Sequence, residues 1–321
     1  MEKSRVLVSH VDLDGVGIIV LALGLKISQD KILMLDYADV ESDVGQEEIF
    51  EVLKEFDDIV VADFSFNKKV INKLLDLGKT IKIYDHHESS LKELGEIVHP
   101  NFVFINDDKR CGTKIFFENY CIPELNLKRV PVIYTQFVEL VNTYDLWKES
   151  HELWIKACDL NRVLFKYKKW GESDPLDSFK NFIRNCLFKF EKYSAWKWTP
   201  NEVVAIEEDR QKELLAYKAA KKILKKRVDE KGRTFGIFAA SSKISVSASK
   251  LLHEYPDLAY VIIINTYKDS SYTRLSFRSK EGRGVISTDL GFKGHALAGG
   301  ETFASGLDLW EGRIKSLPYI I

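Results

Sequence analysis

Acidic and histidine side chains gather directly after short apolar runs of this sequence. The first run leads into His10-Val-Asp-Leu-Asp14, and alternation along an extended backbone places His10, Asp12 and Asp14 on the same side. Three later apolar runs, the last of them Phe137–Val141, are followed by side chains of the same kinds. These are Asp63, the triplet Asp85, His86 and His87, and Asp145.

Carboxylates packed closely would repel one another and raise their pKa values unless a cation lies between them. Oxygen ligands combined with one or two imidazoles suit Mn²⁺, with Mg²⁺ or Co²⁺ as alternatives. Two such ions about 3.5–4 Å apart generate a nucleophile from water and clamp an in-line displacement at phosphorus. The pattern therefore predicts a two-ion site for phosphoryl chemistry.

Each position also has an ordinary structural explanation. Asp63 alone would serve as the N-cap of the next helix. Asp12 and Asp14 would be turn residues, and the two adjacent histidines a polar turn. Because all of these explanations would have to hold together at four strand ends, we favour the metal site.

Strand-like and helix-like segments alternate over residues 1–160 and must position these side chains. Strands that alternate with helices favour a doubly wound, mainly parallel sheet, in which ligands bind at the carboxyl ends of the strands. We predict an α/β catalytic domain over this range. Its expected strands are Val6–Ser9, Ile32–Leu35, Asp58–Ala62 and Thr80–Tyr84, with helices from Gly15 to about Lys26, over Gly45–Phe56 and over Asn67–Leu77.

The rest of the chain divides into two further parts. Residues 161–227 predict a helical connector, because Ile206–Arg227 has long helical character with glutamate early and lysine late, which suits a helix dipole. Residues 228–321 predict a smaller α/β domain. Its expected elements are strands at Thr234–Ala239, Tyr260–Asn265 and Ser271–Arg278, a helix at Val246–His253 and a glycine-rich loop at Gly291–Gly300.

The composition of the 321 residues excludes several classes. The 47 Lys and Arg against 48 Asp and Glu give a net charge of −1, which argues against tight, sequence-independent binding to long nucleic acid. The 4 cysteines are widely spaced with no CxxC pair, so we expect neither a disulfide framework nor a zinc knuckle. No apolar run approaches the ~20 residues of a membrane span, and we expect a soluble, cytoplasmic protein with no membrane partner.

The order of these motifs resembles that of the DHH phosphoesterase superfamily. Its four motifs match Asp12-Leu-Asp14-Gly15, Asp63, Asp85-His86-His87 and Asp145. Near the other end, Gly294-His295-Ala-Leu-Ala-Gly299-Gly300 resembles the glycine/histidine motif of the DHH-associated C-terminal domain. The segment with Arg274 and Arg278 resembles its arginine-bearing strand. The resemblance covers residues 1–160 and 228–321.

The resemblance implies a hydrolase of phosphoester or phosphoanhydride bonds that uses two Mn²⁺ ions. Asp63 matches the bridging ligand, shared by both ions. His10 precedes Asp12 by a spacing shorter than that of family II pyrophosphatases, so it is either a direct ligand, which we expect, or a support for one. The remaining matched ligands are Asp14, His86 and Asp145 for one ion and Asp12 for the other.

Further roles follow from the same resemblance. His87 matches the residue that contacts the scissile phosphate, and Asp85 would orient an imidazole. In the second domain, Arg278 and Arg274 would bind a substrate phosphate. The glycine-rich segment would close over an anionic group through its backbone N–H groups. Its expected substrate-binding residues are His295, Gly294, Gly299 and Gly300.

The compact opening motif and the helical insertion look most like the nanoRNase branch. This implies hydrolysis of short single-stranded oligonucleotides to mononucleotides, since RecJ-type exonucleases are usually longer. The alternatives are a 3′-phosphoadenosine-5′-phosphate phosphatase, a phosphodiesterase for cyclic or linear dinucleotides or other small nucleotides, and a nucleotide-sensing or scaffolding protein without activity. Either a monomer or a homodimer fits the sequence.

Aromatic and basic residues of the connector have two explanations. They would stack bases and neutralise phosphates, as in single-strand binders, or they would form a helical core, which is the commoner case. The residues are Trp170, Phe182, Arg184, Phe188, Tyr193, Trp196 and Trp198.

Overall fold

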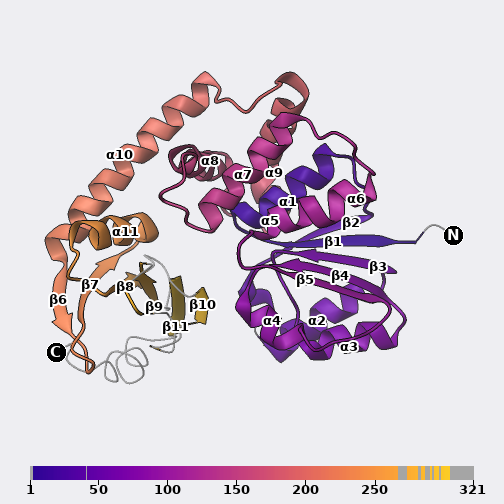
Figure 1. The fold of residues 1–321 in the computed structure, drawn as a ribbon, viewed down its shortest axis with the longest axis horizontal. Coiled ribbons are helices and arrows are strands. Elements are labelled where there is room, and N and C mark those ends of the chain that lie inside the picture. The colour runs from indigo at the N-terminus through magenta and orange to yellow at the C-terminus, as the bar shows by residue number, and fades with distance from the viewer. Residues whose placement is uncertain are drawn as a thin grey trace. The chain divides into compact units, whose positions relative to one another are not determined.

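The computed structural model describes residues 3–40, 42–266, 273–280, 283–285, 290, 293–295 and 298–303. The chain forms two compact units, Met1–Ile206 and Glu207–Ile321, joined within one long helix, α10 (Pro200–Ile223). Each unit has a sheet of its own. Figure 1 shows the two sheets and their helices.

The first unit is built on a five-stranded sheet in which every neighbouring pair is parallel. The strand order is β2-β1-β3-β4-β5, so β1 and β3 are neighbours although β2 lies between them in sequence. This arrangement confirms the predicted doubly wound fold. The strands are β1 (Arg5–His10), β2 (Lys31–Leu35), β3 (Asp58–Ala62), β4 (Thr80–Asp85) and β5 (Phe102–Asn106).

Helices cover both faces of this sheet (Figure 1). Alternation along β1 sends Leu7 into one apolar core and Val6 and Val8 into the other. One face carries α2 (Asp43–Leu53), α3 (Lys68–Asp76) and α4 (Glu88–Leu94). The other carries α1 (Leu13–Gly24), α5 (Gly112–Phe116), a π-helical turn (Phe117–Cys121), α6 (Ile122–Glu124), α7 (Val132–Asp145), α8 (Trp154–Tyr167) and α9 (Pro175–Lys192).

Two features of this unit differ from the sequence prediction. The apolar segment Phe137–Val141 is not a strand but lies in α7, and Asp145 is the last residue of that helix. A short apolar run fits a buried helix as well as a buried strand, and only tertiary packing decides between them. The edge strand β5 was not among the predicted strands. Its side chains are partly buried, except that of Val103, which is exposed.

Most of the aromatic side chains singled out in the connector pack in or against the apolar core of the first unit. Phe182 and Trp196 are buried in the first unit, and Tyr193 and Trp198 are partly buried against the same cluster. The exposed members are Trp170, Phe188 and Arg184.

The second unit contains a six-stranded sheet of order β10-β11-β9-β8-β7-β6, with α11 (Ile244–Glu254) packed against it. Only β7 and β8 are parallel. This mixed sheet confirms the predicted smaller α/β part. The strands are β6 (Lys225–Val228), β7 (Thr234–Ala240), β8 (Tyr260–Thr266), β9 (Thr273–Ser279), β10 (Lys293–His295) and β11 (Ala298–Phe303).

Two local predictions in this unit are wrong. The helix expected to reach Arg227 ends at Ile223, and Lys225–Val228 instead pairs with β7. The glycine-rich loop expected at Gly291–Gly300 contains the antiparallel strands β10 and β11, with Gly294 opposite Gly299. In both places, antiparallel pairing with a neighbouring strand decides the conformation.

None of the four cysteines, all of which lie in the described part of the chain, forms a disulfide. Over the part of the chain that the structure describes, no helix is both long and apolar enough to cross a bilayer.

Candidate metal centre

The predicted ligands of the first unit come from the carboxyl edge of its sheet. Because the chain winds to opposite sides from β1 and β3, these neighbouring strands flank the switch point where doubly wound folds bind ligands. Asp12 follows β1, Asp63 follows β3, and His86 follows β4.

A first group consists of His10, Asp12 and Asp63, whose ligand atoms lie within 4.8 Å of one another. His10 Nδ1 is 3.1 Å from Asp12 Oδ2 and 3.9 Å from Asp63 Oδ2. Burial alone would lower the pKa of His10, but the surrounding carboxylates, Asp12 foremost and then Asp36 and Asp14, together outweigh burial and raise it. The geometry thus places His10 beside the two carboxylates.

Asp12 has a structural task as well. Its Oδ1 accepts a hydrogen bond of 3.0 Å from Gly15 N and caps α1, as the turn explanation predicted. Its Oδ2 remains directed at His10, so capping does not consume the carboxylate. Gly15 is required for this turn, because a Cβ atom there would lie 2.0 Å from the carbonyl oxygen of His10.

A second group consists of Asp14, His86 and Asp145, again within 4.8 Å of one another. His86 Nε2 is 3.8 Å from Asp14 Oδ2 and 3.5 Å from Asp145 Oδ2. Asp14 is buried, and its carboxylate accepts hydrogen bonds from the first backbone N–H groups of α5, at Gly112 (2.6 Å) and Thr113 (2.8 Å). The helix therefore holds Asp14 in place.

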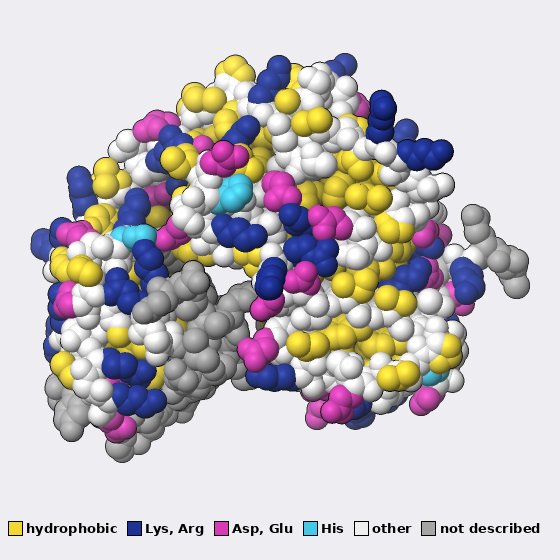
Figure 2. All heavy atoms as spheres, in the orientation of Figure 1, with side chains coloured by type: hydrophobic (Ala, Val, Ile, Leu, Met, Phe, Trp, Pro, Cys, Tyr) yellow, Lys and Arg dark blue, Asp and Glu magenta, His cyan; other side chains and the backbone are white. Residues whose placement is uncertain are grey.

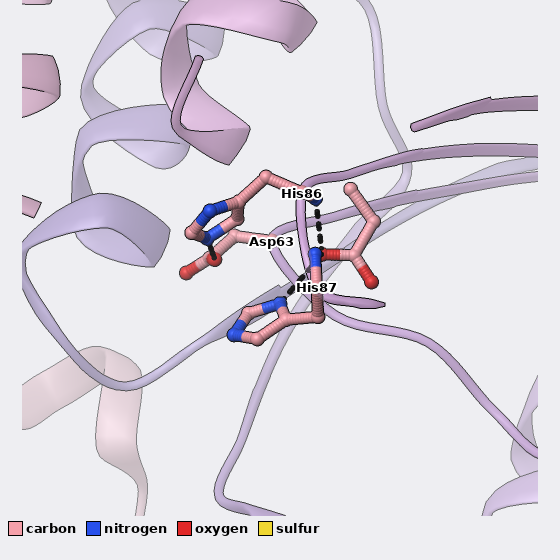
Figure 3. A group of neighbouring side chains, drawn as sticks. Asp63, His86 and His87 are labelled. Carbon is pink, nitrogen blue, oxygen red and sulfur yellow. Dashed lines mark hydrogen bonds and ion pairs between the residues drawn. The ribbon is translucent and has the colours of Figure 1, made fainter. Parts of the chain in front are cut away.

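Asp63 belongs to the first group and also contacts His86 of the second. Its Oδ1 is 3.2 Å from His86 Nε2, a contact drawn in Figure 3, while its Oδ2 faces His10. Asp63 does not cap the next helix, whose N-cap is Asn67. Its backbone has a left-handed φ of 58°, a conformation that L residues adopt at a cost and that is common at functional sites.

His87 is held from both sides of its ring. Nδ1 is 2.7 Å from Asp85 Oδ1, which also accepts the backbone N–H of His86, and Nε2 is 3.1 Å from the hydroxyl of Tyr37. The fixed ring orientation follows from these two contacts. Tyr37 lies in a short 3-10 helix (Tyr37–Asp39) just after β2, and sequence reasoning missed it. The available signal was the position of Tyr37 just after β2, a strand that ends at the same edge of the sheet as β1, β3 and β4.

The electrostatics of the cluster favour a bound cation. Burial and the neighbouring carboxylates, Asp14 foremost, raise the pKa values of Asp63 and Asp145 well above the usual range. Within the described part of the chain, no hydrogen-bond donor reaches the buried Oδ2 atoms of Asp63 and Asp145. Oxygen donors left open beside imidazole nitrogens suit Mn²⁺ or Mg²⁺, so the residues fit the predicted ions.

The predicted substrate residues lie in the second unit. Arg274 and Arg278 are on β9, opposite Asn265 and Val261 of β8. Arg278 is half-buried, and its guanidinium donates to Ser245 Oγ at 2.8 Å. The remaining residues are placed by backbone pairing: Gly294 and His295 on β10, Gly299 and Gly300 on β11.

No protein-family model matches the sequence, and no curated protein matches it significantly. Solved structures do match. The DHH domain of a protein described as a member of a family of ribosomal proteins has a TM-score of 0.62 at 14% identity, over 98% of this chain and 86% of the other. The pGpG-specific phosphodiesterase PggH from Vibrio cholerae has a TM-score of 0.54 at 13% identity, over 98% and 97%. Exonuclease RecJ bound to manganese has a TM-score of 0.53 at 15% identity, over 98% and 88%. The chain therefore shares its fold with these three proteins, one of which is named as a DHH domain.

Proposed function

We propose that this protein is a two-metal phosphodiesterase that hydrolyses short oligonucleotides to mononucleotides. The observation that carries the proposal is the position of Asp63, whose Oδ1 faces one ligand group and whose Oδ2 faces the other. A carboxylate placed in this way suits a bridge between two ions. Two of the proteins that share the fold are named as a phosphodiesterase and an exonuclease.

The first unit supplies both sets of ligands. Asp63 would complete each set, since it belongs to the first group and its Oδ1 contacts His86 of the second. Ions bound there, Mn²⁺ or alternatively Mg²⁺ or Co²⁺, supply an activated water and neutralise charge on the phosphate. The sets are His10 and Asp12 with Asp63, and Asp14, His86 and Asp145 with Asp63.

His87 acts on the substrate rather than on the ions. Asp85 accepts the Nδ1 proton, so Nε2 is the ring atom that remains for a phosphoryl oxygen. The Tyr37 hydroxyl lies 3.1 Å from this atom. It would either move aside when the phosphate binds or form a hydrogen bond to the same phosphate. A hydrogen bond donated by the ring would stabilise negative charge that develops on the phosphoryl oxygens.

The second unit would bind a phosphate of the substrate through residues of its own. Guanidinium groups recognise phosphate in a bidentate manner, which suits Arg278 and Arg274 on their shared strand. Backbone N–H groups close to Gly294, Gly299 and Gly300 would meet an anionic group without obstruction by side chains. His295, the residue after Gly294 on β10, would contact the same phosphate.

Charge distribution supports a short substrate. On the face shown in Figure 2, the basic and acidic side chains of the first unit are interspersed, without a continuous basic track. Long single strands depend on such a track, whereas a substrate of a few nucleotides needs few cations.

The test is Mn²⁺-dependent hydrolysis of labelled RNAs from two to twenty-four nucleotides. We expect the shortest RNAs to be converted to mononucleotides, and Asp63→Asn to abolish turnover while the protein remains folded. Parallel reactions contain 3′-phosphoadenosine-5′-phosphate and a cyclic dinucleotide. Turnover confined to those compounds would replace the proposed substrate, and ion binding without any turnover would indicate a sensor or scaffold.

A further inference from the structure

An exposed aromatic pair stands apart from the core of the connector. The rings of Phe165 and Trp170 are stacked, with centroids 6.3 Å apart and planes inclined by 13°. Trp170 is 73% exposed and Phe165 43% exposed. Lys168 places its ammonium 4.7 Å from the centre of the Trp170 ring. We name Phe165, Lys168 and Trp170 the aromatic platform.

The platform is not explained by folding. Other connector aromatics, such as Phe182 and Trp196, fill the apolar core, and their burial accounts for their presence. A tryptophan that leaves most of its surface in water gains little from packing. An exposed indole beside a lysine is instead the combination with which proteins bind single-stranded nucleic acid, by base stacking and phosphate neutralisation.

Contacts within the first unit connect the platform to the carboxyl edge of the sheet. The segment is anchored to α9 by a hydrogen bond from Lys169 N to Ser178 O, and α9 packs beside β2. Lys168 Nζ also lies 4.7 Å from the centre of the ring of Phe179, a buried residue of α9. Asp36, the residue directly after β2, is the N-cap of the short helix that carries Tyr37.

We propose that Trp170, together with Phe165 and Lys168, stacks a nucleobase of the oligonucleotide whose phosphodiester lies at the metal centre. This inference rests on the proposed function and adds a base-binding subsite on the catalytic unit itself. Stacking is tolerant of sequence because every base has a π-face, so the subsite would select for a neighbouring nucleotide and not for a particular base. Lys168 would neutralise the phosphate next to that base.

The test compares wild type with Trp170→Ala on matched dinucleotides. One substrate is a 5′-phosphorylated adenine dinucleotide, and two others lack the base at the first or the second nucleotide. We expect Trp170→Ala to reduce kcat/KM on the complete dinucleotide by about 5- to 150-fold, the range that corresponds to losing one base–aromatic stack. On the substrate that lacks the stacked base, we expect wild type and variant to be equal.

Two control variants separate stacking from structural damage. Trp170→Phe keeps an aromatic face and should keep most of the activity. Ile155→Ala removes another exposed apolar side chain of α8, about 15 Å along that helix from Phe165, and should have no effect. Thermal unfolding verifies that each variant is folded.

The possible outcomes distinguish the two proposals. If wild type hydrolyses dinucleotides but Trp170→Ala loses nothing, or loses equally on all three substrates, the base-binding subsite is wrong and the proposed function stands. If wild type cleaves none of them, the proposed function fails, and dinucleotide affinity measured in EDTA then decides the subsite. Weaker dinucleotide binding by Trp170→Ala in that titration supports the base-binding subsite. Equal binding by wild type and variant overturns the subsite and would leave the platform as a surface for a protein partner.

Discussion

Gly112 lies directly against the backbone of Asp63. A Cβ atom on Gly112 would come within 2.5 Å of Asp63 Cβ and 2.7 Å of Asp63 Cα, closer than real side chains approach. The same glycine donates its N–H to Asp14. One residue therefore touches both Asp63, the carboxylate proposed to bridge the ions, and Asp14 of the second group.

Gly112→Ala is expected to displace Asp63 or the start of α5. Overpacking at such a contact costs about 1–3 kcal/mol of folding free energy. We also expect most of the Mn²⁺-induced rise in Tm to disappear, because both ligand groups share Asp63. Thermal unfolding with and without Mn²⁺ measures both effects. Gly78→Asn is the control, since nothing lies within 4 Å of that position and asparagine tolerates its φ of 74°; a normal Mn²⁺ response of Gly112→Ala would contradict the prediction.

The two ligand groups predict a pattern of metal content. Asp12→Ser keeps a hydroxyl that caps α1 but removes the carboxylate of the first group, and Asp145→Ala removes one of the second. We expect each variant to retain one of the two ions, and Asp63→Ala to lose both. Elemental analysis after dialysis gives the stoichiometry. Loss of both ions in Asp12→Ser would show that the groups do not act as separate sites.

Asp85→Asn tests how His87 is oriented. The asparagine has the same size but lacks the negative charge that strengthens the hydrogen bond to His87 Nδ1. Substitution of such an orienting partner typically costs about 10- to 100-fold in activity, and we expect this loss in kcat, with KM and metal content unchanged. Tyr37→Phe, which removes only the hydroxyl contact to His87, should cost less. A fall in metal content would instead identify Asp85 as a ligand.

Much of the fold could be predicted from the sequence because buried strands leave a clear local pattern. β3 begins and ends at the predicted residues, and β1 and β4 are each slightly longer than predicted. Asp145 shows the limit of such reasoning. The apolar run before it fits a strand locally, and its helical conformation depends on packing in the core beside α1 and α9.

The acidic and histidine residues of the site were also predictable, because the carboxyl ends of parallel strands meet at one edge. Tyr37 and Gly112 were not. Their importance arises from contacts with His87 and Asp63, which are distant in sequence. The connector aromatics likewise become distinguishable only by burial, which separates Trp196 in the core from Trp170 in solvent.

A buried ion pair between α9 and α10 predicts a strong effect on stability. Lys189 Nζ is 2.7 Å from Glu202 Oε1, both side chains are fully buried, and Trp196 and Trp198 flank the ammonium. Lys189→Met would leave the Glu202 charge buried and unpaired, at a cost of about 3–5 kcal/mol. We expect Lys189→Met/Glu202→Gln to be more stable than the single variant, because the amide still accepts from Thr199 N. Thermal unfolding of both variants makes the comparison, and equal Tm values would contradict it.

Asp229 of the second unit predicts a pH-dependent contribution to stability. Burial would raise its pKa, but hydrogen bonds from the backbone N–H and guanidinium of Arg233 outweigh burial and lower the pKa below 3.8. Because the folded pKa is the lower one, the contribution is present above the unfolded pKa and is lost as the pH falls through the folded value. Asp229→Asn should therefore destabilise the protein by about 1 kcal/mol near pH 7 and progressively less below about pH 4. Tm values of wild type and variant across this range test the sign, with Glu230→Gln in the same turn as an exposed control. A difference that grows on acidification would show that Arg233 does not hold Asp229 in its ionised form.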